Sequence, residues 1–192
     1  TACFNLGFRY RKGEGVVKSA TMAARLMTKA CDKDHAGACA SLGLSYKYGD
    51  GVTKDVFKSY ALFTKSCEKG SRIGCYFKGT SLMNGTGVTK NDLKAAEIFQ
   101  KVCTDGDMDG CHQLAFLYRK GRGVTKDVQR AIALYTKACD AKTASSCAHL
   151  VSIYWFGEGG QKDQKKAIRY LGLACQHGDK KSCEIIRKFK KK

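Results

Sequence analysis

The sequence predicts an all-α protein, a right-handed α/α solenoid of helix–turn–helix repeats with one disulfide in each repeat. Three observations carry this prediction. Pairs of cysteines eight positions apart return every 36 residues, a glycine turn lies at the same place in each period, and two apolar-periodic segments flank that turn. A fixed period of this length is typical of stacked repeats that pack mainly on their neighbours.

The cysteines are interpreted as disulfides within each pair. Zinc sites of the C-x-x-C kind are absent, and ten reduced core cysteines in strict register would be unusual. A tight turn between antiparallel helices can bring each pair within the roughly 4.4–6.8 Å Cα separation of a bridge, worth about 2–3 kcal/mol in the chain-entropy model. The predicted bridges are Cys31–Cys39, Cys67–Cys75, Cys103–Cys111, Cys139–Cys147 and Cys175–Cys183, with Cys3 left over.

Each repeat is expected to hold two helices. In the second repeat, the first helix runs from about residue 37 to 48, with Leu42 and Tyr46 on one face, and Gly49 and Gly51 end it. The second helix runs from about 56 to 68. Its expected N-cap is Asp55, and the equivalent caps are Ser19, Asn91, Asp127 and Asp163. Gly70, Gly106 and Gly178 end second helices, whereas Asp34 and Lys142 replace glycine there and predict slight backbone strain.

The repeats are expected to form one domain over residues 1–192. The predicted repeats span 3–38, 39–74, 75–110, 111–146 and 147–182, followed by a polar capping helix over 183–192 with a frayed lysine tail. The chain opens inside a repeat without Met or a signal peptide, which we interpret as a fragment or a processed product. It has no apolar run of 18 residues, so no membrane span is expected.

The run L-G-x-x-Y-x-x-G-x-G-V-x-K-D at residues 42–55 resembles the SEL-like repeat, a relative of the tetratricopeptide repeat. Together with the cysteine pairs, the chain is similar to the Helicobacter cysteine-rich protein family. The fifth repeat departs from the pattern, with Gly160 in place of the valine and Val151 in place of the glycine. The resemblance implies disulfides within each pair, export from a bacterial cell, and a role in host or partner contact. It also implies weak penicillin-binding or β-lactamase activity.

The residues themselves predict no catalytic centre, metal site or cofactor. A serine β-lactamase needs S-x-x-K with S-D-N and K-T-G, and only Ser66 to Lys69 gives the first of these. We interpret this match as coincidence. The histidines His35, His112, His149 and His177 are scattered and lack ligand spacing. The G-x-G turns link two helices, which argues against a phosphate loop.

A ligand groove is predicted on the first helix of each repeat, two, five, six and nine residues after the second cysteine. These four positions share a helix face and vary between repeats, which suits an extended peptide, although a merely solvated face would look the same. The residues are Asn5, Phe8, Arg9, Lys12, Ser41, Leu44, Ser45, Tyr48, Phe77, Thr80, Ser81, Asn84, Gln113, Phe116, Leu117, Lys120, His149, Ser152, Ile153 and Phe156.

The formal charge of +18 admits nucleic acid, anionic lipid or an acidic protein as partner, or a solvated basic surface. No aromatic–basic motif supports nucleic acid, and the solvated surface is preferred. Two sets of lysines recur outside the groove, and they are expected to speed encounter with acidic surfaces. They are Lys18, Lys54, Lys90, Lys126 and Lys162, and Lys29, Lys65, Lys101 and Lys137.

The leading functional hypothesis is a secreted or periplasmic module that binds a peptide or protein, in contact between bacterium and host. Disulfides persist in oxidising compartments, which favours this location. The alternative is weak hydrolysis of a β-lactam, which rests on the resemblance alone.

Overall fold

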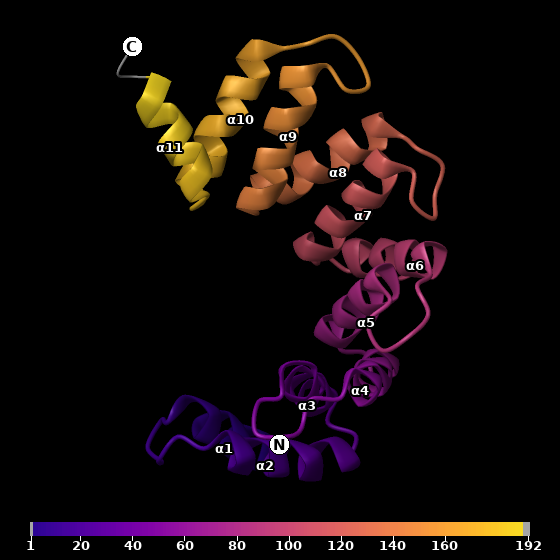
Figure 1. The fold of residues 1–192 in the computed structure, drawn as a ribbon, viewed down its shortest axis with the longest axis vertical. Helices are drawn as coiled ribbons and strands as arrows, with labels where there is room; N and C mark the ends of the chain where they lie inside the picture. Colours follow the sequence, from indigo (N-terminus) through magenta and orange to yellow (C-terminus); the bar gives the residue numbers. More distant parts are fainter. Residues whose placement is uncertain (1, 190–192) are drawn as a thin grey trace. The chain divides into compact units, whose positions relative to one another are not determined.

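The computed structural model describes residues 2–189, and over that range it is helical, without a strand (Figure 1). The tail lysines 190–192 of the expected capping helix lie outside the described residues. The helices are α1 (Ala2–Lys12), α2 (Ala20–Asp32), α3 (Ala36–Tyr48), α4 (Val56–Glu68), α5 (Arg72–Asn84), α6 (Asp92–Thr104), α7 (Met108–Lys120), α8 (Val128–Asp140), α9 (Ala144–Phe156), α10 (Gln164–Gln176) and α11 (Lys180–Phe189).

Two compact units make up the described chain, residues 2–98 and residues 99–189, with the boundary inside α6. Within each unit the helices alternate between two kinds. The odd-numbered helices are called A helices and precede the glycine turn; the even-numbered ones are called B helices and follow it. Each B helix ends in a short turn that leads into the next A helix. The predicted all-α repeat class is therefore confirmed.

The helix ends are set by the residues that the sequence singles out. The Asp55 carboxylate accepts hydrogen bonds from the backbone N–H groups of Phe57 and Lys58, at 3.1 and 3.0 Å, and so caps α4. Asn91 caps α6 in the same way through Lys94, at 2.9 Å. Gly49 ends α3 in the left-handed region at φ 78°, where a side chain would be strained. The expected N-caps are thus confirmed, and α3 begins one residue earlier than predicted.

Two glycines are required by close packing. A Cβ on Gly51 would lie 2.2 Å from the Ala20 carbonyl oxygen, and its φ is +72°, so this turn lies directly against the start of the preceding B helix. A Cβ on Gly43 would lie 2.6 Å from the Phe63 ring, so the lack of a side chain on α3 makes room for Phe63 of α4. Phe63 is fully buried there, which contributes about 1.5–3 kcal/mol of hydrophobic stabilisation.

All five predicted disulfides are present, each joining the end of a B helix to the following A helix. Their Cα–Cα separations run from 4.4 to 4.9 Å, inside the normal range. Cys3 is the free cysteine of the described chain and is half-buried. The turn that each bridge closes also fixes the angle between its two helices.

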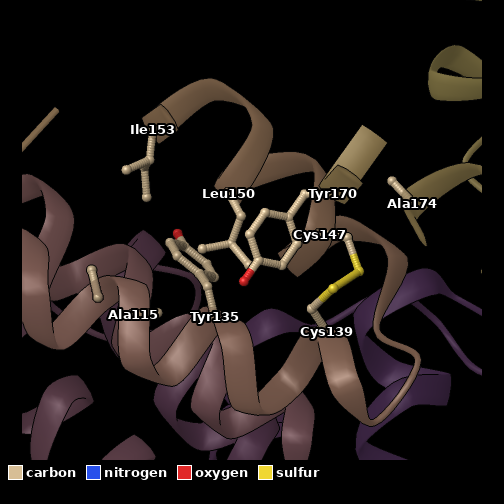
Figure 2. Packing of buried hydrophobic residues seen from close by; sticks show 9 residues of the cluster. Ala115, Tyr135, Cys139, Cys147, Leu150, Ile153, Tyr170 and Ala174 are labelled. Carbon is tan, nitrogen blue, oxygen red and sulfur yellow. A yellow bond between two sulfur atoms is a disulfide. The ribbon is translucent and has the colours of Figure 1, made fainter. Parts of the chain in front are cut away.

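Each unit has its own core. In residues 99–189, the side chains of Tyr135, Leu150 and Tyr170 pack around the Cys139–Cys147 bridge (Figure 2). In residues 2–98, Met27 and Leu42 pack around Cys31–Cys39. These two disulfides are therefore part of the apolar core, whereas both cysteines of Cys175–Cys183 are half-buried.

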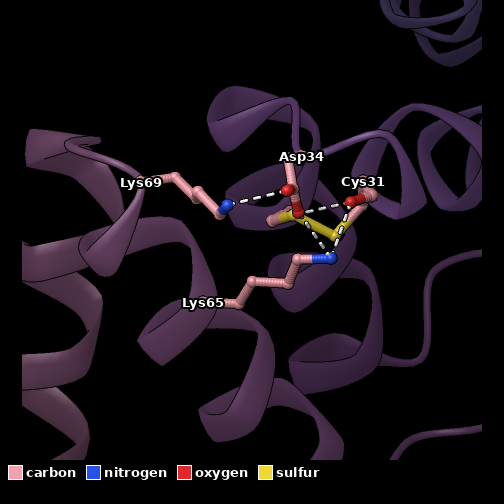
Figure 3. Close-up of polar contacts among 5 residues, drawn as sticks. Cys31, Asp34, Lys65 and Lys69 are labelled. Atoms are coloured by element: carbon pink, nitrogen blue, oxygen red, sulfur yellow. Dashed lines mark hydrogen bonds and ion pairs between the residues drawn. A yellow bond between two sulfur atoms is a disulfide. The ribbon is translucent and has the colours of Figure 1, made fainter.

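In the turn after α2, Asp34 stands where other repeats have glycine, and its carboxylate contacts two lysines. Asp34 has φ +59°, and its carboxylate accepts a 2.7 Å hydrogen bond from Lys69 Nζ and pairs with Lys65 Nζ at 3.1 Å (Figure 3). Lys65 Nζ also donates to the Cys31 carbonyl at 2.9 Å. These hydrogen bonds lower the pKa of Asp34, the bond from Lys69 having the largest effect. Lys142 has φ +68°, so both predicted left-handed positions are observed.

Candidate functional site

The predicted groove residues lie on the A helices α1, α3, α5, α7 and α9, and their exposure depends on their position in the repeat. The residues nine positions after the cysteine are exposed: Lys12, Tyr48, Asn84, Lys120 and Phe156. The residues at two and five positions are exposed in α1 and half-buried elsewhere: Asn5, Phe8, Ser41, Leu44, Phe77, Thr80, Gln113, Phe116, His149 and Ser152. We call these fifteen residues the A-helix surface. Each unit carries its own part of it.

The residues six positions after the cysteine need a correction. Ser45, Ser81, Leu117 and Ile153 are at most 5% exposed, so they lie beneath the A-helix surface and are closed to a ligand. The reason is helical geometry, because this position turns toward the packed neighbours. Arg9, at the same place in α1, is exposed, and its Nε donates to the Glu14 carbonyl at 3.0 Å.

Sequence reasoning missed the position eight residues after the cysteine, which links successive A helices. Arg11 of α1 donates to the Ser41 carbonyl and to Ser45 Oγ of α3, at 3.2 and 2.8 Å. Lys47 of α3 lies over the Phe77 ring of α5, 5.4 Å from its centroid. The sequence signal for these contacts is the basic residue that recurs at this position, as Arg11, Lys47 and Arg119. These contacts hold the A-helix surface in a fixed arrangement within the unit.

In residues 99–189 the same register gives a buried polar cluster around Arg119. The Arg119 side chain is buried, and its guanidinium donates to both carboxylate oxygens of Glu158, with Nε to Oε2 at 2.8 Å. It also donates to His149 Nδ1 at 3.0 Å and to Ser152 Oγ at 2.9 Å. Arg119 thus joins α7 to α9 and to the turn after α9, directly under the exposed residues of the surface.

The cluster fixes the protonation of its histidines. His149 stacks on the buried Tyr135 ring at 4.9 Å, and its Nδ1 accepts from an arginine, so its proton is on Nε2. Burial lowers the pKa of His149 to about 4, with smaller contributions from His112 and Arg119. Burial also lowers the pKa of His112, whose Nδ1 lies 2.8 Å from Ser146 Oγ. Burial raises the pKa of Tyr135. Both histidines are neutral at pH 7.

The single S-x-x-K match cannot act as a nucleophile. Ser66 is fully buried, and its hydroxyl donates to the Ala36 carbonyl at 2.7 Å. Cys67 between the two motif residues is in a disulfide, and Lys69 is paired with Asp34. A reactive serine must instead be accessible and bonded to a base. The interpretation of this match as coincidence agrees with these contacts.

The recurrent lysines of the turns lie off the A-helix surface. Lys18, Lys54, Lys90, Lys126 and Lys162 are exposed before B helices, and Lys29, Lys101 and Lys137 are exposed near B-helix ends. Lys65 is half-buried because it is engaged by Asp34 and Cys31. Exposed lysines affect encounter with charged molecules more than the lifetime of a complex.

Residues 2–189 contain no group of three or more His, Cys, Asp or Glu side chains placed to hold a metal ion. Over the same range, no helix has the length and apolarity to cross a membrane.

Comparison with known families matches the Sel1 repeat to five segments of the chain, residues 1–35, 36–71, 73–107, 109–142 and 145–179. A search of curated proteins finds no match.

Solved structures with the same fold include c5321, a protective antigen of uropathogenic Escherichia coli with an SLR fold. It is 29% identical at a TM-score of 0.85, covering 94% of this chain and 39% of that one. A Sel1 repeat protein from Oxalobacter formigenes is 32% identical at 0.86, covering 94% and 74%. Cysteine-rich protein B of Helicobacter pylori is 31% identical at 0.54, covering 71% and 98%. This chain therefore spans well under half the length of the E. coli antigen.

Proposed function

The chain belongs to the Sel1 repeat family, and on this premise we propose that it is an exported module that binds an extended peptide on its A-helix surface. The observation that carries the proposal is the mixture of exposed aromatic and polar side chains, such as Tyr48, Asn84 and Phe156, at one position of the A helices. Exposed aromatic residues provide burial on binding, and amides and hydroxyls pair with a peptide backbone.

Export is supported by the five disulfides. Bridges of this kind are rarely maintained in a reducing cytosol, so a protein that depends on them belongs in the periplasm or outside the cell. The E. coli relative is described as a protective antigen, and from it we extend contact with a host to this chain as part of the proposal.

A matched pair of exposed aromatic residues tests the binding surface. Tyr48 ends an A helix and is 68% exposed, whereas Phe57 lies on a B helix and is 72% exposed. The oxidised 192-residue chain would be panned against a random peptide display library, and binding of the selected peptide measured by surface plasmon resonance. Tyr48→Ala is expected to speed dissociation about tenfold, and Phe57→Ala to leave it unchanged.

The turn lysines test the electrostatic part of the proposal in the same measurement. Reversing the charge at Lys54, Lys90 and Lys126 is expected to slow association with an acidic selected peptide and to weaken its salt dependence, with dissociation little changed. If Phe57→Ala weakens binding as much as Tyr48→Ala, the A-helix surface is not the binding site. Loss of all binding in the lysine variant even at low salt would make the lysines the recognition surface.

The alternative function, weak β-lactam hydrolysis, has no supporting contact among the described residues, because the one candidate serine is buried and hydrogen-bonded. Nitrocefin turnover by protein purified from a lactamase-free host tests it. We expect no nitrocefin turnover above the buffer rate. Turnover that is lost in Ser66→Ala would instead support β-lactam hydrolysis by this chain.

A further inference from the structure

A shallow apolar hollow lies between the last two A helices, α9 and α11, with α10 beneath it. Its volume is about 390 Å³. Val151, Trp155 and Phe156 of α9 and Ile185 of α11 form its walls, and the buried Leu171 of α10 lies at its base. Trp155, Phe156 and Ile185 are 39%, 65% and 43% exposed, so apolar surface remains open to solvent at this place.

The hollow exists because the repeat changes its chemistry here. Trp155 occupies the register in which Arg11 and Arg119 make polar bonds to the next A helix. An indole has one donor and no acceptor, and it presents an apolar face instead. Ile185 likewise stands where the earlier A helices carry Ser41 and His149. The junction of α9 and α11 is therefore apolar and open, whereas the α1–α3 and α7–α9 junctions are polar.

The hollow lies in a unit with an excess of basic residues, and one cationic and one anionic side chain line it. Lys181 lines it and is exposed. Asp179 also lines it, but its carboxylate accepts bonds from the backbone N–H and the hydroxyl of Ser182, as the cap of α11. Glu158 is occupied by Arg119. Lys and Arg outnumber Asp and Glu by 16 to 9 over residues 99–189, so an approaching chain meets a cationic surface.

We propose that this hollow takes one large apolar side chain of an acidic peptide, whose neighbouring carboxylates pair with Lys181. The volume lies at the lower end of the roughly 300–1,000 Å³ typical of ligand pockets, which suits a leucine or phenylalanine side chain with its backbone. The inference rests on the proposed function, because it places one anchor residue of the bound peptide on the A-helix surface. Apolar burial provides the affinity, and the lysine selects against basic sequences.

Trp155 is the only tryptophan of the chain, so its fluorescence reports on this hollow directly. The probes are three tryptophan-free hexapeptides with blocked ends: Asp-Glu-Leu-Phe-Glu-Asp, the same peptide with Ala-Ala at its centre, and the same peptide with lysine for each acid. The first is expected to shift Trp155 emission to shorter wavelength and to saturate. The other two should give no saturable shift at the same concentrations.

Two variants with matched controls test the contacts. Ile185→Ser is expected to weaken binding of the acidic apolar peptide about tenfold, and Ile168→Ser, an exposed isoleucine of α10 outside the hollow, to leave it unchanged. Lys181→Glu should weaken binding about threefold at low salt and little at high salt, and Lys165→Glu should have no comparable effect. Helical circular dichroism and a non-reduced mass map check that each variant keeps its fold.

The proposal is wrong if the acidic apolar peptide leaves Trp155 emission unchanged, or if the lysine peptide binds equally well. A shift that depends on protein concentration without peptide would identify a second copy as the occupant and also overturn it. A further outcome is that Tyr48→Ala abolishes binding of a library-selected peptide that Ile185→Ser and Lys181→Glu still bind normally. That result would support the A-helix surface as the binding site and contradict the hollow as its anchor site.

Discussion

At the scale of single residues, the turn glycines differ in what they are needed for. Gly51 combines a φ of +72° with backbone atoms 2.2 Å from any added Cβ. Gly70 has a φ of +82° but open space around it, and Gly160 has open space and no positive φ. A comparison of the three positions therefore separates the free-energy cost of a side chain at positive φ from the cost of a steric clash.

Alanine at these three positions is therefore expected to give a graded loss of stability. Gly160→Ala should change the free energy of unfolding by less than about 0.5 kcal/mol, and Gly70→Ala should cost about 1 kcal/mol. Gly51→Ala should cost about 2 kcal/mol or more, because the turn must move off α2. Urea unfolding with the disulfides intact measures all three. An equal cost at Gly51 and Gly70 would show that the close contact does not matter.

His149 gives the fold a dependence on pH. Its pKa is near 6.5 in the unfolded chain and about 4 in the folded chain, so the unfolded state binds more protons between these values. The free energy of unfolding should fall as pH drops from 7 to 5, by about 1–2 kcal/mol after allowing for partial exposure. His149→Gln should reduce the slope of the profile. An unchanged slope in His149→Gln would contradict the assignment.

At the scale of helices, two charged contacts between repeats differ in burial. The Arg119 and Glu158 side chains are 8% and 36% exposed, whereas Lys69 and Asp34 are 44% and 52% exposed. A partly buried, bidentate pair is stronger than an exposed single contact, because solvent screens the latter more.

Double-mutant cycles should reproduce this difference. We expect a coupling of about 1–2 kcal/mol between Arg119→Met and Glu158→Gln, methionine being the residue at the equivalent place in α5. The cycle of Lys69→Met with Asp34→Asn should give no coupling beyond experimental error. A larger coupling at Asp34 would mean that the turn, rather than the A-helix junction, holds successive repeats together.

Helix bounds, caps and disulfides could be predicted from the sequence because they depend on residues within about ten positions of one another. Cys67 and Cys75 are eight apart, and Asp55 caps a helix through Lys58, three residues on. The contacts of Arg119 with His149 and Glu158 join residues 30 and 39 apart. No local pattern encodes such distances, so the burial of Leu117 and the apolar hollow beside Trp155 emerged only from the structure.

At the scale of the whole molecule, one set of residues recurs with the repeat and a second set varies. Glycines, caps and bridges recur with the period and build the scaffold, whereas exposed A-helix residues vary from repeat to repeat. Variable side chains on a rigid repeated frame suit recognition of an extended partner. The turn lysines lie elsewhere on each repeat, and we propose that they add a general attraction for acidic molecules.

The most direct test of this account is hydrogen–deuterium exchange of the oxidised chain with and without a library-selected peptide, read by mass spectrometry. A peptide bound on the A-helix surface should slow exchange in segments of the A helices of the unit that holds it, among α1, α3, α5, α7 and α9, with little change in α2, α4, α8 and α10. Protection confined to the B helices and the lysine turns, with the A helices unchanged, would contradict it.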